Sequence, residues 1–264
     1  TYTIPTEVEN GLSAYYTFNG NLNATSGNIN GTAINGVSYE RDRYGNPNSA
    51  LVLSNNKYVS VPLNVSENRF TVSMYFKTTN KNTGLFSASC GELGADGHDR
   101  HLFLSEGNIV SRIWNNEGIS STGCNFSDGK WHHLVYTYDS TSTPQKGQRI
   151  YVDGQLVASG TKPFSDLVCQ NRIMIGFSND ITPSYFQGSL DDIAIWDRSL
   201  SSYEIQLIND GTITKPYLRY EERSLSSNYT MNIIGSEFVS FKNIGIGRFN
   251  GDRTVSYTHL RAHE

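Results

Sequence analysis

The acidic side chains of this sequence lack the spacing of a catalytic carboxylate pair. Cleavage of a glycosidic bond needs two carboxylates about 5–10 Å apart, and one strand can supply them when acidic residues alternate along it. The nearest approach to such a pair, Glu92 and Asp96, lies in a glycine-rich loop. The sequence contains neither a G-x-S-x-G elbow nor an H-E-x-x-H pair. We therefore predict no catalytic residue and expect that this chain is not an enzyme.

Side chains that could hold a polar ligand such as a sugar occur in two places. A sugar is held when an aromatic ring stacks on it while amides and charged groups bind its hydroxyls. Trp114 and Asn115 stand where a predicted strand meets a loop, and Arg112 shares the strand and face of Trp114. His98 and Asp99 lie in a second predicted loop. These five are the candidate ligand-binding residues, and the alternative for Trp114 is packing between two sheets.

The histidines favour structural roles. His98 and His101 are three residues apart, but an extended loop does not bring side chains at that spacing together as a helix would. His132 and His133 follow Trp131 in a predicted strand, where they face opposite sides. We therefore expect a solvated loop at the first pair and strand packing at the second.

The three cysteines, Cys90, Cys124 and Cys169, form no C-x-x-C pair. At most one disulfide can form within the chain. Cys90 and Cys124 both lie in predicted loops, so a bond between them is one candidate pairing. It requires Cα atoms within about 7 Å of each other.

The composition narrows the fold class and the partners. The chain has 264 residues, a formal net charge of −4 and 12% aromatic residues, and its length allows one large domain or one domain plus a fragment. The mildly acidic balance disfavours nucleic acid as a partner. No apolar stretch approaches the roughly 20 residues that cross a bilayer, so we expect no membrane insertion. Many Gly, Asn, Tyr and Phe residues predict an all-β protein with many turns.

Short alternating segments predict a β-sandwich. A Ser201–Glu204 capping box, apolar Ile205 and Ile208, and a following Gly211 predict one helix over residues 201–210. Asp153-Gly154 is the strongest hairpin signal. The predicted strands are residues 14–18, 50–53, 58–62, 70–78, 101–104, 109–114, 131–138, 149–152, 155–158, 172–177 and 186–196.

Two blocks of the chain resemble a known family. The first is residues 11–53, and the second contains DGKWHHLVYTYD, IYVDGQLVASG and GSLDDIAIWDRSLSSYEI within residues 128–205. Together they resemble the laminin-G-like, concanavalin A-like jelly-roll domains, particularly the bacterial extracellular type. The resemblance implies a two-sheet antiparallel jelly-roll β-sandwich over residues 12–211 that ends in one short helix.

The resemblance also divides the rest of the chain. Residues 1–11 are expected to be a lead-in or linker, and residues 212–254 a linker or the start of a truncated further module. Residues 255–264, VSYTHLRAHE, resemble translated sequencing-adapter read-through. We expect this last segment to be an artefactual tail.

A structural calcium ion is the cofactor that the resemblance implies. Its ligands would be Asn19, with Asn21 nearby, from the turn after the first strand, and Asp191 or Asp192 from a late strand. Many relatives have Asp where this chain has Asn19, so affinity is expected to be lower. Because successive strand residues alternate, only one of the two aspartates can point inward. The alternative is that the asparagines are turn residues and Asp192 caps a neighbouring amide.

The resemblance implies a non-catalytic binding or adhesion module of a larger protein. The expected partner is carbohydrate or a cell-surface protein, and the expected location is extracellular or on the cell surface. Two alternatives stay open. The domain could be a structural spacer without its own ligand, or an accessory carbohydrate-binding domain of a secreted glycosidase or protease.

Overall fold

A computed structural model describes residues 4–66, 68–92, 98–113, 117–141, 147–161 and 167–210, and three short strands beyond them. The chain divides into two compact units, Thr1–Gly211 and Thr212–Glu264.

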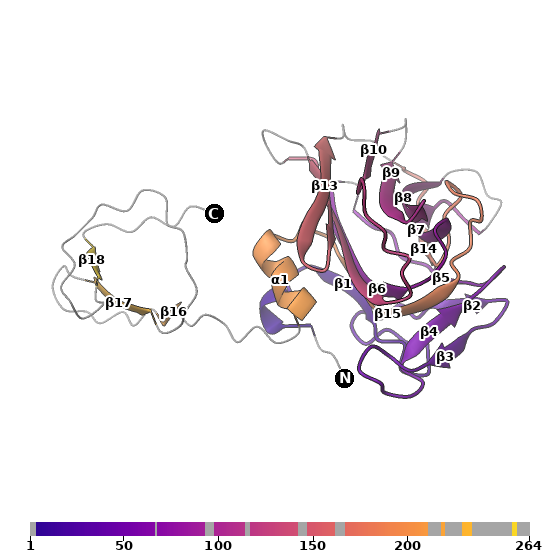
Figure 1. The fold of residues 1–264 in the computed structure, drawn as a ribbon, viewed down its shortest axis with the longest axis horizontal. Coiled ribbons are helices and arrows are strands. Elements are labelled where there is room, and N and C mark those ends of the chain that lie inside the picture. The colour runs from indigo at the N-terminus through magenta and orange to yellow at the C-terminus, as the bar shows by residue number, and fades with distance from the viewer. Residues whose placement is uncertain are drawn as a thin grey trace. The chain divides into compact units, whose positions relative to one another are not determined.

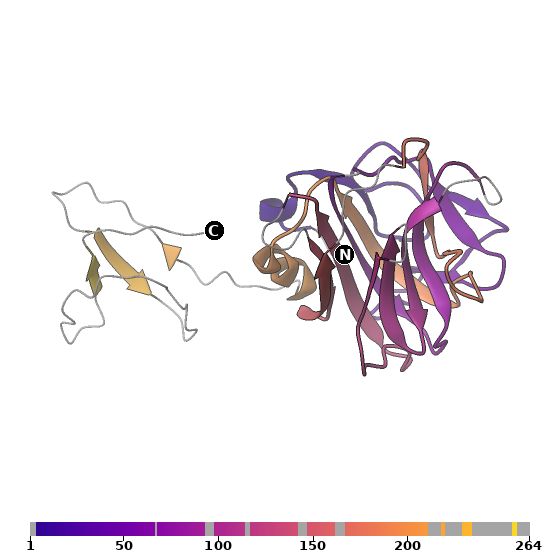
Figure 2. The same ribbon diagram turned by 90° about the horizontal axis from the view of Figure 1, so that it is seen from above.

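The first unit consists of two antiparallel sheets packed face to face (Figure 1, Figure 2). The predicted fold class, an all-β sandwich of the jelly-roll type with one short helix at its end, is confirmed. Sheet 1 contains, in spatial order, β13 (Gln155–Thr161), β12 (Gly147–Val152), β11 (Trp131–Asp139), β6 (Arg69–Lys77), β15 (Gly188–Trp196), β4 (Ala50–Leu53) and β3 (Ser38–Glu40), with β1 (Leu12–Tyr16) also paired to β15. Sheet 2 contains β10 (Glu117–Ser120), β9 (Asn108–Ile113), β8 (His98–Ser105), β7 (Thr83–Ser89), β14 (Arg172–Ile175), β5 (Tyr58–Val61) and β2 (Thr32–Ile34).

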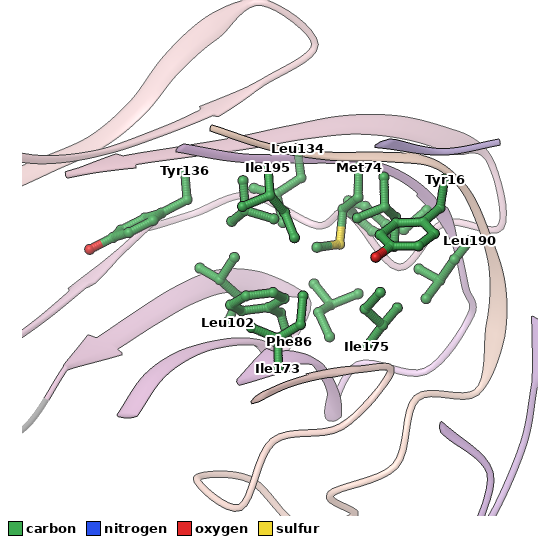
Figure 3. Packing of buried hydrophobic residues seen from close by; sticks show 14 of the residues in the cluster. Tyr16, Met74, Phe86, Leu102, Leu134, Tyr136, Ile173, Ile175, Leu190 and Ile195 are labelled. Atoms are coloured by element: carbon green, nitrogen blue, oxygen red, sulfur yellow. The ribbon is translucent and has the colours of Figure 1, made fainter. Parts of the chain in front are cut away.

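The core lies between the sheets and follows the alternation of the strands. The alternating apolar residues of β6 all belong to the buried core cluster, as predicted: Phe70, Val72, Met74 and Phe76. Figure 3 shows Met74, Leu134 and Ile195 of sheet 1 directed toward Leu102 and Ile173 of sheet 2. Every second side chain of these strands therefore packs in the core between the sheets. This burial of apolar surface is the main source of stability of such a sandwich.

Among the described residues of the first unit, the strand pattern of the sequence misses four strands: β2, β3, β7 and β10. All residues of β7 are buried, so the strand shows no polar–apolar alternation. β8 begins at His98, three residues before the predicted strand, so residues 98–100 lie in a strand and not in a loop. Residues 4–11, expected as a lead-in, contain the short helix η1 (Thr6–Val8). Val8 is buried there, and its carbonyl accepts the indole N–H of Trp196 at 2.7 Å.

The helix α1 (Ser202–Asp210) begins as its capping box predicts. Ser201 N–H donates to Glu204 Oε2 at 2.8 Å, and Glu204 N–H donates to Ser201 Oγ at 3.3 Å. Ile205 and Ile208 are buried. The helix packs on the outer face of sheet 1, where Tyr75 donates its hydroxyl to the carbonyl of Asn209 at 2.9 Å.

The disulfide joins Cys90 to Cys169, whose Cα atoms are 4.9 Å apart, so the candidate pairing of Cys90 with Cys124 is wrong. Cys124 is a free cysteine. Cys90 follows β7 and Cys169 precedes β14, and these strands pair so that Arg172 lies opposite Ser89. Strand pairing across sheet 2 therefore brings together two cysteines that are 79 residues apart in sequence.

The second unit is described only at β16 (Leu218–Arg219), β17 (Tyr229–Ile233) and β18 (Val255–Tyr257), which form an antiparallel sheet. The predictions for residues 212–254 and 255–264 fall mostly outside the described residues.

Among the described residues, no helix has the length and apolar character needed to span a bilayer.

Candidate functional site

A polar pocket of about 230 Å³ lies where β15 changes its pairing partner. On one side β15 pairs with β4 over Gly188–Leu190 and then with β1 over Ile193–Trp196. The two residues between these ladders, Asp191 and Asp192, face the gap. The pocket is lined by Thr17, Asn19, Asp42, Tyr44, Asn46, Ser49, Asp191 and Asp192.

A β-bulge places both aspartates on one side of β15. The register against β6 shifts between Asp191 and Ala194, and Asp192 has a φ of +45°. Leu190 and Ile193 both belong to the core, three positions apart where regular alternation would require two. The expectation that only one of the aspartates can face a common site is therefore wrong, because the extra residue breaks the alternation.

Arg43 binds both carboxylates. Its Nη1 lies 2.6 Å from Asp191 Oδ2 and 2.7 Å from Asp192 Oδ2, and its side chain is only 9% exposed. Tyr15 donates its hydroxyl to the other oxygen of Asp192 at 2.5 Å. The guanidinium lies over the Tyr75 ring at 3.7 Å. These contacts hold a buried charge cluster directly beneath the pocket.

The charges of this cluster perturb one another. Burial raises the pKa of Asp191, and the neighbouring Asp192 carboxylate raises it further, although Arg43 acts in the opposite direction. Burial also raises the pKa of Asp192. Burial acts to lower the pKa of Arg43, but the carboxylates of Asp192 and Asp191 outweigh it and the pKa lies above its ordinary value. The guanidinium therefore stays charged and supplies the positive charge of the cluster.

The rim of the pocket is a loop between β3 and β4 that its own side chains hold together. Asp42 Oδ1 accepts the N–H groups of Tyr44 at 2.9 Å and Asn46 at 2.8 Å, and Oδ2 accepts the Asn46 amide at 2.8 Å. Arg43 lies over the Tyr44 ring at 4.4 Å, yet Tyr44 remains 58% exposed. The loop therefore presents a fixed aromatic ring to solvent at the mouth of a polar pocket.

Five of the eight pocket residues were missed by the sequence reasoning: Thr17, Asp42, Tyr44, Asn46 and Ser49. The signal available was the segment RDRYGN at 41–46, which combines charged residues, an aromatic ring and a Gly-Asn turn. Nothing in that segment shows that it lies beside β15, because the contact depends on the pairing of β4 with β15.

The residues predicted to bind calcium do not fit such an ion. Asn19, Asp191 and Asp192 line the pocket, but Asn21 does not. The Asn21 side chain stabilises its own turn, donating to the Asn19 carbonyl and accepting from Asn23 N–H, both at 2.9 Å. The carboxylate pair already binds Arg43. Within the described residues, no group of three His, Cys, Asp or Glu side chains is arranged to hold a metal.

Of the predicted ligand-binding residues, those whose side chains are described do not line this pocket. Trp114, Asn115 and the His98 side chain lie outside the described residues. Asp99 was expected on an exposed loop, but it lies in β8 and is 3% exposed, so that expectation is wrong. Arg112 lies on β9, partly exposed, and forms an ion pair with Asp180 at 2.7 Å. Neither Asp99 nor Arg112 lines the pocket.

A Ser–His–Asp cluster on sheet 2 has the residue types of a hydrolase triad but not the access. Ser178 Oγ and His101 Nδ1 are 3.0 Å apart. His101 Nε2 and Asp180 Oδ1 are 3.8 Å apart, beyond hydrogen-bonding distance. Ser178 is fully buried. The cluster cannot present its hydroxyl to a substrate and acts as structural packing.

Comparisons with solved structures identify the same sandwich in carbohydrate-associated proteins. Domain 4 of AbnA, an extracellular arabinanase from Geobacillus stearothermophilus solved with arabinotriose, matches with a TM-score of 0.57 and 20% identity, covering 75% of this chain and 98% of that domain. The ligand binding domain of botulinum neurotoxin serotype D, solved with N-acetylneuraminic acid, matches with a TM-score of 0.56 and 18% identity, covering 80% of this chain and 53% of that chain.

Sequence comparisons give the family. Human pentraxin-4 is 34% identical over 87 residues, which are 30% of this chain and only 17% of that relative's length. A laminin-G family model, described as the concanavalin A-like lectin/glucanases superfamily, matches residues 53–206. The chain therefore belongs to the concanavalin A-like lectin/glucanase superfamily.

Proposed function

We propose that this domain is a non-catalytic carbohydrate-binding module of a secreted or cell-surface protein, and that its ligand binds in the polar pocket beside Tyr44. The observation that carries the proposal is the exposed Tyr44 ring held by Asp42 and Arg43 at the mouth of a pocket lined by hydroxyls, amides and carboxylates. Aromatic faces stack on sugar rings, and convergent polar groups bind their hydroxyls.

The size of the pocket supports a small ligand or the end of a longer one. Pockets that enclose a drug-sized molecule measure about 300–1,000 Å³, whereas this pocket measures about 230 Å³. One sugar ring suits that space. The Asp42 hydrogen bonds fix the loop in advance, so little conformational entropy is lost when a ligand binds.

The charge of the pocket supports a neutral sugar. Asp42, Asp191 and Asp192 line it, and Arg43 supplies one balancing positive charge. An anionic sugar would meet an excess of negative charge at short range. Of the two ligands seen in the structural neighbours, neutral arabinotriose therefore resembles the expected ligand more closely than N-acetylneuraminic acid does.

The arrangement of the aspartates supports binding and not hydrolysis. A glycosidase places its two carboxylates on opposite sides of the scissile bond. Asp191 and Asp192 are adjacent on one side of β15, and both bind the same nitrogen of Arg43. They act as a structural pair beneath the ligand.

The disulfide supports an oxidising location. In most organisms disulfides persist outside the cytosol. The Cys90–Cys169 disulfide therefore favours an extracellular or cell-surface location. The arabinanase domain found among the structural neighbours comes from an extracellular enzyme. An accessory carbohydrate-binding role beside a separate catalytic domain agrees with the proposal. A structural spacer without a ligand would not need the pocket.

The test is binding to a glycan array that contains matched neutral and sialylated oligosaccharides, including arabinotriose, lactose and sialyllactose. Calorimetry on the best neutral glycan then compares the protein with Tyr44→Ala and with Tyr203→Ala. Tyr203 is a matched control because it is a tyrosine of similar exposure, 51%, on α1. Tyr44→Ala should weaken binding about fivefold, since loss of stacking costs about 1 kcal/mol.

Three results would contradict the proposal. Unchanged affinity of a folded Tyr44→Ala variant would remove the pocket from the function. Binding to none of the glycans would leave the spacer role. Release of new reducing ends from a bound oligosaccharide would show that the domain is catalytic.

A further inference from the structure

The inference concerns the charge balance at the Asp191–Asp192 pair, where two carboxylates are 2% and 6% exposed. The bulge in β15 puts them side by side, and neither has a ladder partner on the side of β15 that faces β4 and β1, whereas on the other side Asp191 lies opposite Tyr75 of β6. Two adjacent buried carboxylates need a compensating positive charge, since repulsion and lost hydration would otherwise disfavour the fold. A cation of the chain, a cation from solution or a proton on one carboxyl can supply it.

The chain supplies that cation itself. Arg43 Nη1 reaches both carboxylates within 2.7 Å, and Tyr75 and Tyr44 contact its guanidinium. The neighbouring Arg41 differs, because it is exposed and donates to the carbonyl of Gly45 at 2.7 Å. One arginine of this loop therefore serves the buried pair, and the other closes the loop at its surface.

Most of the carboxylate oxygens that a divalent ion would need are already engaged. Calcium binds oxygens at about 2.3–2.6 Å and requires six to eight of them. One oxygen of each aspartate accepts from Arg43, and the second oxygen of Asp192 accepts from Tyr15. Both oxygens of Asp42 hold the rim loop. A divalent ion here would displace these donors and meet the guanidinium charge.

We propose that Arg43 is a built-in counterion that stands where a metal ion would otherwise balance Asp191 and Asp192, so that this domain folds and works without calcium. The inference goes beyond the proposed function, because it concerns the fold beneath the pocket and holds whatever ligand the pocket takes. It also agrees with the uncharged residue Asn19 beside the pair, since a site that already has its cation does not need a further carboxylate there.

The first experiment measures the melting temperature of the unaltered protein in millimolar calcium and in EDTA, and titrates calcium chloride by calorimetry. We expect identical melting temperatures and no binding heat. A rise in melting temperature with calcium that disappears in Asp191→Asn would overturn the proposal. So would calcium binding that Asp191→Asn abolishes.

The second experiment removes the counterion. Arg43→Ala should lower the melting temperature in EDTA by about 10 °C, since it leaves two buried carboxylates unbalanced. The matched control Arg41→Ala, which loses the same charge from the surface of the same loop, should change it by about 2 °C or less. In Arg43→Ala, calcium should raise the melting temperature, because the pair is then open to a cation.

A charge-balanced variant separates the counterion role from simple packing. Arg43→Ala combined with Asp192→Asn removes one charge of each sign and should recover part of the stability lost in Arg43→Ala. Equal melting temperatures for Arg43→Ala and Arg41→Ala would overturn the proposal. If Arg43→Ala does not fold, recovery of a folded protein by the second substitution supports it, and failure of both variants leaves the calcium titration of the unaltered protein as the deciding result.

Discussion

Removal of the Cys90–Cys169 disulfide should lower the free energy of unfolding by about 4–5 kcal/mol. The bond closes a loop of 79 residues. In the chain-entropy description, such a loop lowers the entropy of the unfolded chain by about 15 cal/mol/K, which is about 4.5 kcal/mol at 25 °C. The β7–β14 ladder lies directly beside the bond, so the folded state keeps its geometry without it. The effect therefore acts mainly on the unfolded chain.

The assay is urea unfolding of the oxidised protein and of a Cys90→Ser/Cys169→Ser double variant. Cys124→Ser is the control, since Cys124 is not bonded, and it should unfold like the unaltered protein. If the double variant does not fold, the unaltered protein with and without a reductant replaces it. Thiol titration of the denatured oxidised protein should find one free thiol among the three cysteines.

Two results would refute this reasoning. The first is a non-reduced peptide map that links Cys90 to Cys124, or a titration that finds three thiols. The second is a loss of less than about 1 kcal/mol in the double variant, which would show that the unfolded chain is not restricted as the loop length requires.

The remaining predictions concern pH and steric fit. Burial lowers the pKa of His133 from its ordinary value of 6.5 to about 4. Between these two pH values only the unfolded chain takes up a proton, so the free energy of unfolding should fall by about 3 kcal/mol as the pH is lowered from 7 to 4. Urea unfolding across this range should show a shallower fall in His133→Gln. His132 has a pH effect of the opposite sign, because its hydrogen bond to Asp153 raises its pKa. Its contribution to stability is complete below about pH 6 and is lost as the pH rises through the folded pKa. His132→Gln should therefore lower the melting temperature more at pH 5.5 than at pH 8.5, and an equal loss at both would contradict this. Gly84→Ala should destabilise the fold by about 3 kcal/mol or more, because its Cβ would overlap the backbone carbonyl of Ser184; a urea midpoint equal to that of the unaltered protein would show that the segment moves aside freely.

Local signals in the sequence determined much of the fold. The alternation in β6 identified its core-facing residues, because a strand that faces a core on one side places every second side chain there. The Ser201–Glu204 capping box located the start of α1, because its hydrogen bonds join residues only three positions apart. The family resemblance implied the two-sheet antiparallel jelly roll. β7 escaped prediction because its sequence, TGLFSAS, shows no polar–apolar alternation.

The candidate site depended on contacts between distant segments. The sequence pointed to Asn19, Asp191 and Asp192, all of which line the pocket, but it assigned them an ion that Arg43 replaces. Likewise, the cysteine that pairs with Cys90 was decided by the pairing of β7 with β14.

The sequence by itself determined most of the strands and the helix of the first unit, and that they build a two-sheet sandwich, because these properties follow from the periodicity of neighbouring residues. The tertiary structure alone decided that Asp191 and Asp192 face the same side, that Arg43 lies between them and Tyr75, and that Tyr44 stands over the pocket. The physical reason is that a bulge and a change of strand partner are set by the register of strands far apart in the chain, which no local pattern encodes.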